Sequence, residues 1–316
     1  MSSGFILLFL RFSGGSNIYV GFNRMTYIRI LKKKIASYSS LKDITKAIQL
    51  VALAKLTSLN YKLKRRQTQL WVIKKIFQLQ HRIDSDYDAR RYILILVTTD
   101  RSCCGILNSN VFKVVNKVLS TLLSHQKVVK LITIGVKGKY FLRRAYPSLV
   151  KLCVTDVGSE PLSLLLVQHI AENVLRCDIL VDQYIIIYNR YINIVEQRIS
   201  YYKIYTPYLL SSSIYSFLEF GKKYYSFWAS VLKLYNARIF YLCDLFFSFF
   251  CLLLLDALEE NEYSELGARY RAMDNSHTNI VEMLNTLLIK YHKVRQETIT
   301  RELIEIISAA SCILEK

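Results

Sequence analysis

Helix-breaking residues are scarce in this chain. It has three prolines and ten glycines in 316 residues, and neither type occurs in residues 25–84 or after Gly267. Proline and glycine are the residues that most disfavour the interior of a helix. Their absence therefore allows two very long, uninterrupted helices, one towards each end of the chain.

Motifs of common catalytic and cofactor sites are also absent. The loop 99–108 has one glycine and residues 135–139 (GVKGK) have two, so neither is a dinucleotide fingerprint or a P-loop. The five histidines are scattered, and the seven cysteines are odd in number, without repeating spacing or a CxxC pair. We therefore expect reduced cysteines, no metal, no cofactor and no intrinsic catalysis.

Acidic residues are nearly absent from the first quarter of the chain. Residues 1–84 contain sixteen Lys or Arg but only two acids, Asp43 and Asp84, and the formal charge of the chain is +19. This excess fits an acidic partner, which would be nucleic acid, an anionic membrane surface or an acidic protein. It also fits a solvated helix face that follows a targeting peptide. Composition leaves these options open.

Residues 1–24 have the composition of a targeting segment. They contain Arg11 and Arg24, several serines and glycines, an apolar run at residues 5–10, and no acid. The basic residues follow the apolar run, which disfavours a secretory signal, so a mitochondrial transit peptide is the prediction for 1–24. An unstructured leader is the alternative.

No apolar run is long enough to cross a bilayer. Residues 239–255 carry one charge, Asp244, and the part without charge, 245–255, has eleven residues, against the roughly 20 that a spanning helix needs. Asp244 suits the first turn of a helix. We predict the start of a long C-terminal helix over 241–316, buried against a folded domain; a membrane anchor is the alternative.

The C-terminal residues have the apolar spacing of a coiled coil. Alternating steps of four and three connect Leu266, Tyr270, Met273, His277, Ile280, Leu284, Leu287, Tyr291 and Val294. After a step of five, the pattern resumes at Ile299, Leu303, Ile306, Ala310 and Ile313, which indicates a discontinuity in the supercoil. A narrow apolar stripe between polar faces needs a partner helix.

Residues 25–84 supply that partner. Ile28, Leu31, Ile35 and Tyr38 have helical spacing, and Leu41, Ile44, Ile48 and Val51 repeat it after a shift. We predict that the two terminal helices pair antiparallel, with a seam that includes Ile44, Ile48, Val51, Met273, Ile280, Leu284 and Leu287.

Strands alternate with helices in the central segment, 85–240. Strands are expected over 91–98, 128–135, 150–157 and 179–188, with an antiparallel strand in 192–205, and helices over 108–124, 137–145 and 162–176. This alternation predicts a Rossmann-like αβ domain with a mainly parallel sheet covered on both faces. The fold class is therefore α/β with a long antiparallel coiled coil. Residues 208–240, rich in Tyr and Ser, suit an elaborated surface or a contact for an additional subunit.

Three segments have distinctive sequences. Residues 44–56 (ITKAIQLVALAKL) match the pattern ITKAMxMVAxAKL, and residues 99–108 (TDRSCCGILN) match S/T-DRGLCGGLN, departing at Ser102, Cys103 and Ile106. In the C-terminal helix the matching residues are Ala268-Arg269, Ala272 to Asn275, Asn279, Glu282-Met283, Leu287, Tyr291, Arg295-Gln296, Ile299-Thr300, Glu302-Leu303 and Glu305-Ile306. Together these segments resemble the gamma subunits of the rotary (F-type) ATP synthase of mitochondria.

This resemblance implies a function. It implies the rotor shaft of the central stalk, non-catalytic itself, which carries c-ring rotation to three catalytic beta subunits for proton-driven ATP synthesis. The implied partners are the alpha and beta subunits, delta/epsilon-type stalk subunits and the c-ring, with no nucleic acid. The implied place is the matrix side of the mitochondrial inner membrane, peripheral to it.

The resemblance also implies site residues. Arg295, Gln296 and Thr300 correspond to contacts with a beta-subunit loop, and Gln296 and Thr300 share a helix face. The expected tip in an apolar bearing contains Ile304, Ile306, Ile307, Ala310 and Ile313. The expected loop of the foot domain contains Asp100, Arg101, Cys104, Gly105 and Asn108. No His lies near Cys104 in sequence, so a buried structural thiol is favoured over a nucleophile.

Two other classes of function remain at this point. A coiled coil that binds nucleic acid would use the basic N-terminal helix, although the sequence has no base-reading domain or repeated aromatic platform. A membrane-anchored scaffold would use residues 239–255. Neither class explains why the C-terminal helix matches the gamma-subunit pattern at so many residues.

Overall fold

The structure is a computed structural model that describes residues 15–81, 89–159, 161–178, 180–206 and 239–314. The first fourteen residues of the expected transit peptide and nearly all of the segment 208–240 lie outside the described residues. The chain divides into two compact units, one from residues up to Ile48 and from Asp274 onward, the other from Gln49 to Met273. We call them the stalk unit and the sheet unit.

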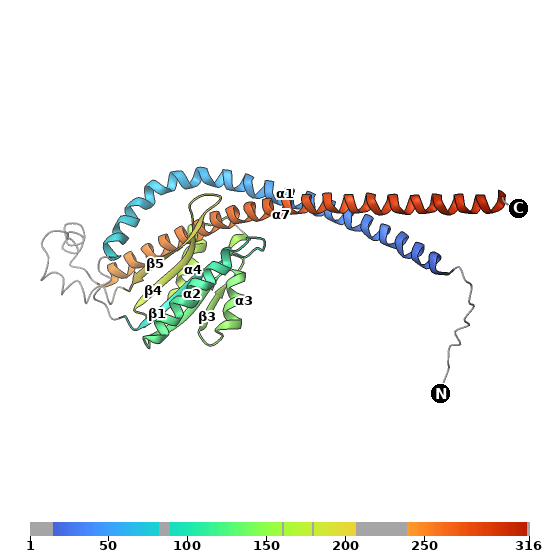
Figure 1. Ribbon diagram of the computed structural model, residues 1–316. Coiled ribbons are helices and arrows are strands. Elements are labelled where there is room, and N and C mark those ends of the chain that lie inside the picture. Colours follow the sequence, from blue (N-terminus) through green and yellow to red (C-terminus); the bar gives the residue numbers. More distant parts are fainter. Residues whose placement is uncertain (1–14, 82–88, 160, 179, 207–238, 315–316) are drawn as a thin grey trace, which may run out of the picture. The chain divides into compact units, whose positions relative to one another are not determined.

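Two long helices dominate the chain (Figure 1). Helix α1 comprises Gly15–His81, 67 residues, and helix α7 comprises Ile239–Leu314, 76 residues. Each helix has one part in the stalk unit and one in the sheet unit. The long C-terminal helix is thus present, and it includes the apolar run 239–255.

The sheet unit contains a five-stranded sheet in the order β3-β2-β1-β4-β5. The strands are β1 (Arg91–Val97), β2 (Val128–Ile134), β3 (Val150–Val154), β4 (Gln183–Tyr191) and β5 (Gln197–Tyr205). The β1–β2, β1–β4 and β2–β3 pairs are parallel, and β5 is antiparallel to β4. The α/β class and the mainly parallel sheet are confirmed.

Both faces of the sheet are covered, because successive side chains of a strand point to opposite faces. In β1, Leu94 and Leu96 join a core with helix α2 (Leu107–Ser124) and with Leu142 of helix α3 (Val136–Ala145). Ile93, Ile95 and Val97 join the opposite core, with helix α4 (Leu164–Arg176) and α7. A short 3-10 turn, η1 (Val157–Ser159), follows β3.

The apolar start of α7 belongs to the second core. Phe250, Cys251, Leu253, Leu254 and Leu258 are buried there against the sheet and α4. The predicted burial of this segment against a folded domain is thus observed. Among the described residues, no helix combines the length and apolar character that crossing a membrane requires.

In the stalk unit, α7 keeps coiled-coil spacing. Partly buried residues follow steps of three and four: His277, Ile280, Leu284, Leu287, Tyr291, Val294 and Thr298. The half-buried stripe continues in phase to Thr298 and Ile299 is exposed, so the predicted jump to Ile299 stays a prediction. Thr298 continues the heptad spacing, but it is polar, so a pattern built from apolar residues does not include it. From Ile299 to Ile313 every residue is exposed.

On α1 the burial pattern differs from the predicted seam at Ile44 and Val51. Leu31 is buried, and Ile28, Ile35 and Tyr38 are partly buried. Further along, Ile44 and Val51 are 52% and 57% exposed, while the buried positions are Thr45, Gln49, Ala52 and Leu56. The helix has apolar residues on two faces, and spacing alone does not decide which of them is buried. Ile48 is partly buried and Met273, on α7, is buried.

Candidate functional site

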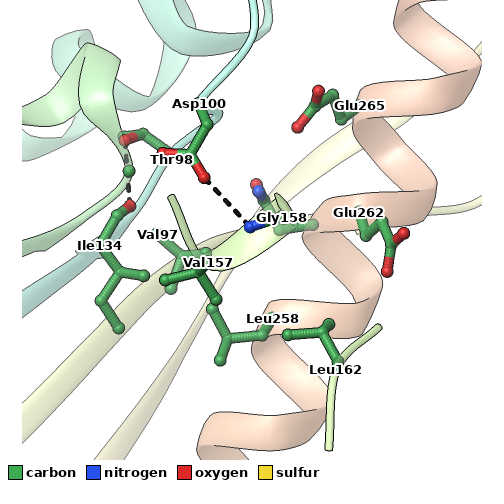
Figure 2. Close-up of a pocket in the computed structure, with 12 residues that line it drawn as sticks. Val97, Thr98, Asp100, Ile134, Val157, Gly158, Leu162, Leu258, Glu262 and Glu265 are labelled. Atoms are coloured by element: carbon green, nitrogen blue, oxygen red, sulfur yellow. Dashed lines mark hydrogen bonds between the residues drawn. The ribbon is translucent and has the colours of Figure 1, made fainter. Parts of the chain in front are cut away.

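The loop after β1 is organised by the carboxylate of Asp100. Its Oδ1 accepts hydrogen bonds from the backbone N–H groups of Val136 (2.9 Å) and Asp156 (3.3 Å), and its Oδ2 accepts one from Gly158 (3.2 Å). Figure 2 shows the bond to Gly158. These donors lie at the start of α3 and in the turn after β3. One side chain therefore joins three connections at the carboxyl edge of the sheet.

This arrangement occupies a position where other α/β proteins bind phosphate. In nucleotide-binding α/β proteins, the N–H groups at a helix N-terminus beside the sheet bind phosphate. At the start of α3, the carboxylate of Asp100 already accepts the N–H of Val136. Asp100 itself, with Glu262 and Glu265 of α7, also lines the neighbouring pocket, whose other walls are largely apolar (Figure 2). An anionic ligand would meet three carboxylates there.

The glycines of the GVKGK segment have a packing role. Gly135 has φ of 113°, and a Cβ there would lie 2.4 Å from the carbonyl oxygen of Thr98. At Gly138 a Cβ would lie 2.1 Å from Oγ1 of Thr133, and its N–H donates to Oγ1 of Thr98 (3.0 Å). Glycine at both positions thus permits α3 to approach β1 and β2 closely.

The loop also tolerates its departures from the family pattern. Of its described residues, only Cys103 (φ 67°) and Gly105 (φ 56°) have positive φ. Ser102 and Ile106 replace glycines of the pattern but adopt negative φ, with Ile106 at −87°. Gly105, which is retained, is the glycine that the backbone requires. The side chain of Ile106 is 74% exposed.

Asn108 joins the two ends of the loop, and Cys104 holds its middle. Asn108 accepts from the N–H of Thr99 (3.2 Å) and donates to its Oγ1 (2.8 Å). Cys104 is buried, and Arg269 of α7 donates to its Sγ (3.4 Å) while forming an ion pair with Glu265. The predicted loop residues therefore lie together, and of these Arg101 and Gly105 are exposed.

Burial controls the chemistry of Cys104. It raises the pKa of the thiol to about 11, and nearby Glu265 adds to the rise while Arg269 opposes it. At neutral pH the thiol is protonated, so it is a poor nucleophile. Among the described residues, no three His, Cys, Asp or Glu side chains are arranged to hold a metal ion.

We expect Cys103 to be alkylated well before Cys104. Cys103 is exposed, whereas the thiolate fraction of Cys104 is roughly a hundredfold below that of an ordinary thiol because its pKa is about 11 instead of 9.0. Iodoacetamide at pH 8 and fragmentation mass spectrometry of the peptide with both residues measure the two rates. Equal rates on the folded chain would contradict the burial of Cys104.

The predicted contact residues of α7 are all available to a partner. Arg295, Gln296 and Thr300 are exposed, and Oγ1 of Thr300 donates to the carbonyl of Gln296 (2.9 Å). In the expected tip, Ile304, Ile306, Ile307 and Ile313 are 56%, 64%, 66% and 75% exposed, and Ala310 is exposed too. Such a run of exposed apolar side chains is typical of a surface that a partner covers.

One feature of the structure differs from what the sequence predicts. Asp256, Glu260, Asn261 and Ser264 of α7 are buried against the sheet although all are polar. Their spacing of four, one and three places them on one helix face. Polar residues in a helix usually indicate a solvent-exposed face. The polarity of these four residues therefore predicts exposure, whereas the structure buries them.

These features define a class of protein. The chain combines an α/β unit, whose sequence has no phosphate-loop motif, with two long helices, one of which ends in exposed apolar residues; this combination is typical of a subunit that partner chains cover. A family model described as ATP synthase matches residues 27–313. The chain belongs to the gamma-subunit family of ATP synthase.

Curated relatives agree with this, and a solved structure has a similar fold. The mitochondrial gamma subunit of Arabidopsis thaliana is 28% identical over 286 residues, 90% of this chain and 85% of the relative. The gamma chain of Rickettsia prowazekii is 28% identical over 92% of this chain and 100% of its own length. A chain of the Euglena gracilis mitochondrial ATP synthase has a similar fold, with a TM-score of 0.79 at 22% identity, covering 91% of this chain and 95% of that one.

Proposed function

We propose that this chain is the rotor shaft of the central stalk of an ATP synthase. It transmits rotation of a membrane c-ring to three catalytic beta subunits, so that proton flow drives ATP synthesis, and it has no catalytic site itself. The observation that carries this proposal is the family match over residues 27–313, which includes most of both long helices and the whole sheet unit. A structural neighbour with a TM-score of 0.75 and 21% identity belongs to the rotor of the Euglena gracilis enzyme.

The proposed partners follow from the same relatives. They are the alpha and beta subunits of the catalytic hexamer, delta/epsilon-type stalk subunits and the c-ring. Solved neighbours come from an assembly of F1 and c-ring and from a central stalk with c-ring. The proposed location is the matrix side of the mitochondrial inner membrane, after removal of a transit peptide within residues 1–24. Support comes from relatives named as mitochondrial, such as those of Arabidopsis thaliana and Rattus norvegicus.

The mechanism is differential contact. A shaft with unlike faces favours a different conformation in each beta subunit that it touches, so rotation shifts each subunit through its states in turn. Helix α7 offers such faces: a half-buried stripe to Thr298, exposed polar residues at Arg295, Gln296 and Thr300, and the exposed apolar tip. At 1.5 Å per residue, its 76 residues extend about 114 Å.

In this mechanism the three polar residues hold a beta-subunit loop, and the apolar tip turns in an apolar bearing where few directional bonds oppose rotation. The basic side chains of α1, such as Lys32, Lys33 and Lys34, are exposed and form a surface for acidic loops of the hexamer. Coupling then depends on torsional stiffness and on a few polar contacts, not on a pocket of this chain.

The test of this function is a pull-down of the tagged full chain from detergent-solubilised mitochondria. One copy for every three alpha and three beta subunits, with ATPase activity in the eluate, is the expected result. An eluate without alpha and beta subunits would overturn the proposal and point to a scaffold or a nucleic-acid partner.

We expect the double variant Gln296→Ala/Thr300→Ala to lower ATP hydrolysis by the assembled complex several-fold, because it removes polar contacts to a beta subunit. Thr286→Ala is the matched control: Thr286 and Thr300 are both exposed on α7, and each donates to the carbonyl four residues back, at 2.7 and 2.9 Å. Steady-state ATPase assays of complexes with equal subunit content measure the difference. Equal activities in the two variants would show that Gln296 and Thr300 do not form the contact with the beta subunit.

A further inference from the structure

A row of buried polar groups joins α7 to the β4–β5 hairpin within the sheet unit. Asn261 accepts a hydrogen bond from the side-chain amide of Asn189 (2.9 Å), and Ser264 donates to the backbone carbonyl of Asn189 (2.9 Å). Glu260 accepts from the backbone N–H of Tyr191 (3.0 Å). On either side of these three, Asp256 accepts from the hydroxyl of Tyr202, and Arg271 donates to the carbonyl of Val195 (2.7 Å).

The α7 groups of this row from Asp256 to Ser264 are shielded from water, whereas the bond from Arg271 to Val195 is exposed. Asp256, Glu260, Asn261, Ser264 and Asn189 are all between 0% and 6% exposed. Burying polar groups costs free energy that their mutual hydrogen bonds only roughly offset. The apolar neighbours Phe250, Leu253 and Leu254 already bind the same helix to the same sheet. Stability alone therefore does not account for the polar row.

Hydrogen bonds resist sliding and rotation between packed elements more strongly than apolar contacts do. Apolar surfaces resist separation, but they resist sliding and rotation only through their shape, whereas a hydrogen bond weakens steeply when its geometry changes. Buried polar pairs are known to fix one register between packed elements. Gly267 adds a steric restraint in the same row, since a Cβ there would lie 3.1 Å from the ring of Tyr191. Along residues 256–271, α7 is thus fixed in both rotation and axial position.

We propose that this row, which we call the torque clamp, holds α7 against rotation relative to the sheet. It comprises Asp256, Glu260, Asn261 and Ser264 with their partners on β4 and β5. Under load, twist applied to the sheet unit enters α7 through these bonds. The proposal rests on the proposed rotor function. Its members are positioning residues: they touch no substrate and act through the angle of the shaft.

The decisive variant is Asn189→Leu/Asn261→Leu, combined with Ser264→Ala. Replacing both partners of the Asn189–Asn261 bond with apolar residues of similar shape can be nearly neutral, whereas Ser264→Ala removes one donor from the carbonyl of Asn189 and costs some stability. A purely structural row therefore predicts a change in thermal stability only, with unchanged coupling. The torque clamp predicts unchanged assembly and ATP hydrolysis within twofold, but a loss of at least threefold in protons pumped per ATP hydrolysed.

The measurement uses the complete synthase in proteoliposomes, with ATP-driven proton uptake and ATP hydrolysis recorded together. Angular fluctuation of a bead fixed to the sheet unit should widen in the triple variant. Ser248→Ala, an exposed serine on the same helix, is the control and should leave both readouts unchanged. Ser264→Thr, which keeps the hydroxyl, should couple better than Ser264→Ala.

Each result of these two measurements either supports the torque clamp or overturns it. An unchanged ratio of pumping to hydrolysis and an unchanged bead fluctuation in the triple variant would overturn the torque clamp. If the triple variant fails to assemble, Ser264→Ala alone decides by the same two readouts, in the same direction. Failure of the unsubstituted chain to copurify with alpha and beta subunits would instead overturn the rotor function.

Discussion

Replacing Asp100 with alanine is expected to lower the free energy of unfolding of the full chain by about 3 kcal/mol. The carboxylate accepts three backbone N–H groups from two connections of the sheet unit. A hydrogen bond to a charged group contributes roughly 1.5–3 kcal/mol, and the contributions of neighbouring bonds are not additive. Because all three donors lose their acceptor at once, we expect one of the largest single-residue effects in the chain.

Urea-induced unfolding followed by circular dichroism measures this effect. Asp100→Asn is the informative intermediate, since its carbonyl oxygen still accepts while its amide group cannot, and we expect about half the loss. Asp244→Ala, which removes an exposed carboxylate from α7, is the control and should change stability little. A loss below 1 kcal/mol for Asp100→Ala would show that other contacts hold the two connections in place.

The loop around Asp100 shows what sequence could predict here. The pattern retained Asp100, Cys104, Gly105 and Asn108, and the structure brings all four into one bonded loop. The backbone role of each glycine was not predictable, because residue type restricts φ but the path of the chain decides which position adopts a positive φ. Gly105 proved to need positive φ, whereas Ser102 and Ile106 adopt φ values open to any residue.

Helices α1 and α7 show that residue spacing alone also does not decide which helix face is buried. Spacing predicted the seam of α7 up to Val294, because there the apolar residues occupy one face. On α1 two apolar faces compete, and only the fold decides that Thr45 and Gln49 are buried while Ile44 and Val51 are exposed. Likewise, the row from Asp256 to Ser264 has the polarity of a solvent face, and only the partners on β4 and β5 show otherwise.

Replacing Arg269 with methionine is expected to destabilise the chain by about 3 kcal/mol at pH 7.5. Arg269 and Glu265 form a largely buried ion pair on α7, with side chains 12% and 16% exposed. Removing one partner of a buried pair leaves a charge without compensation, which typically costs 3–5 kcal/mol. Methionine preserves much of the length and apolar character of the arginine stem.

The effect of Arg269→Met should depend on pH. Burial raises the pKa of Glu265, and Arg269 opposes that rise, so the variant should have a still higher pKa at Glu265. A carboxyl group with a raised pKa in the folded state binds protons more readily there than in the unfolded chain. Its contribution to stability is therefore fully present below the unfolded pKa and is lost as pH rises through the folded pKa.

Unfolding curves at pH 7.5, 6 and 5 for both chains test this sign. We expect the stability difference between them to shrink as pH falls towards the ordinary range of a glutamate, because protonation then removes the uncompensated charge. The variant Glu265→Gln/Arg269→Met has no such charge and should recover most of the stability, with no pH dependence from this site. A difference that stays constant from pH 7.5 to 5 would mean that Arg269 stabilises the contact between α7 and Cys104 by packing, and not by neutralising Glu265.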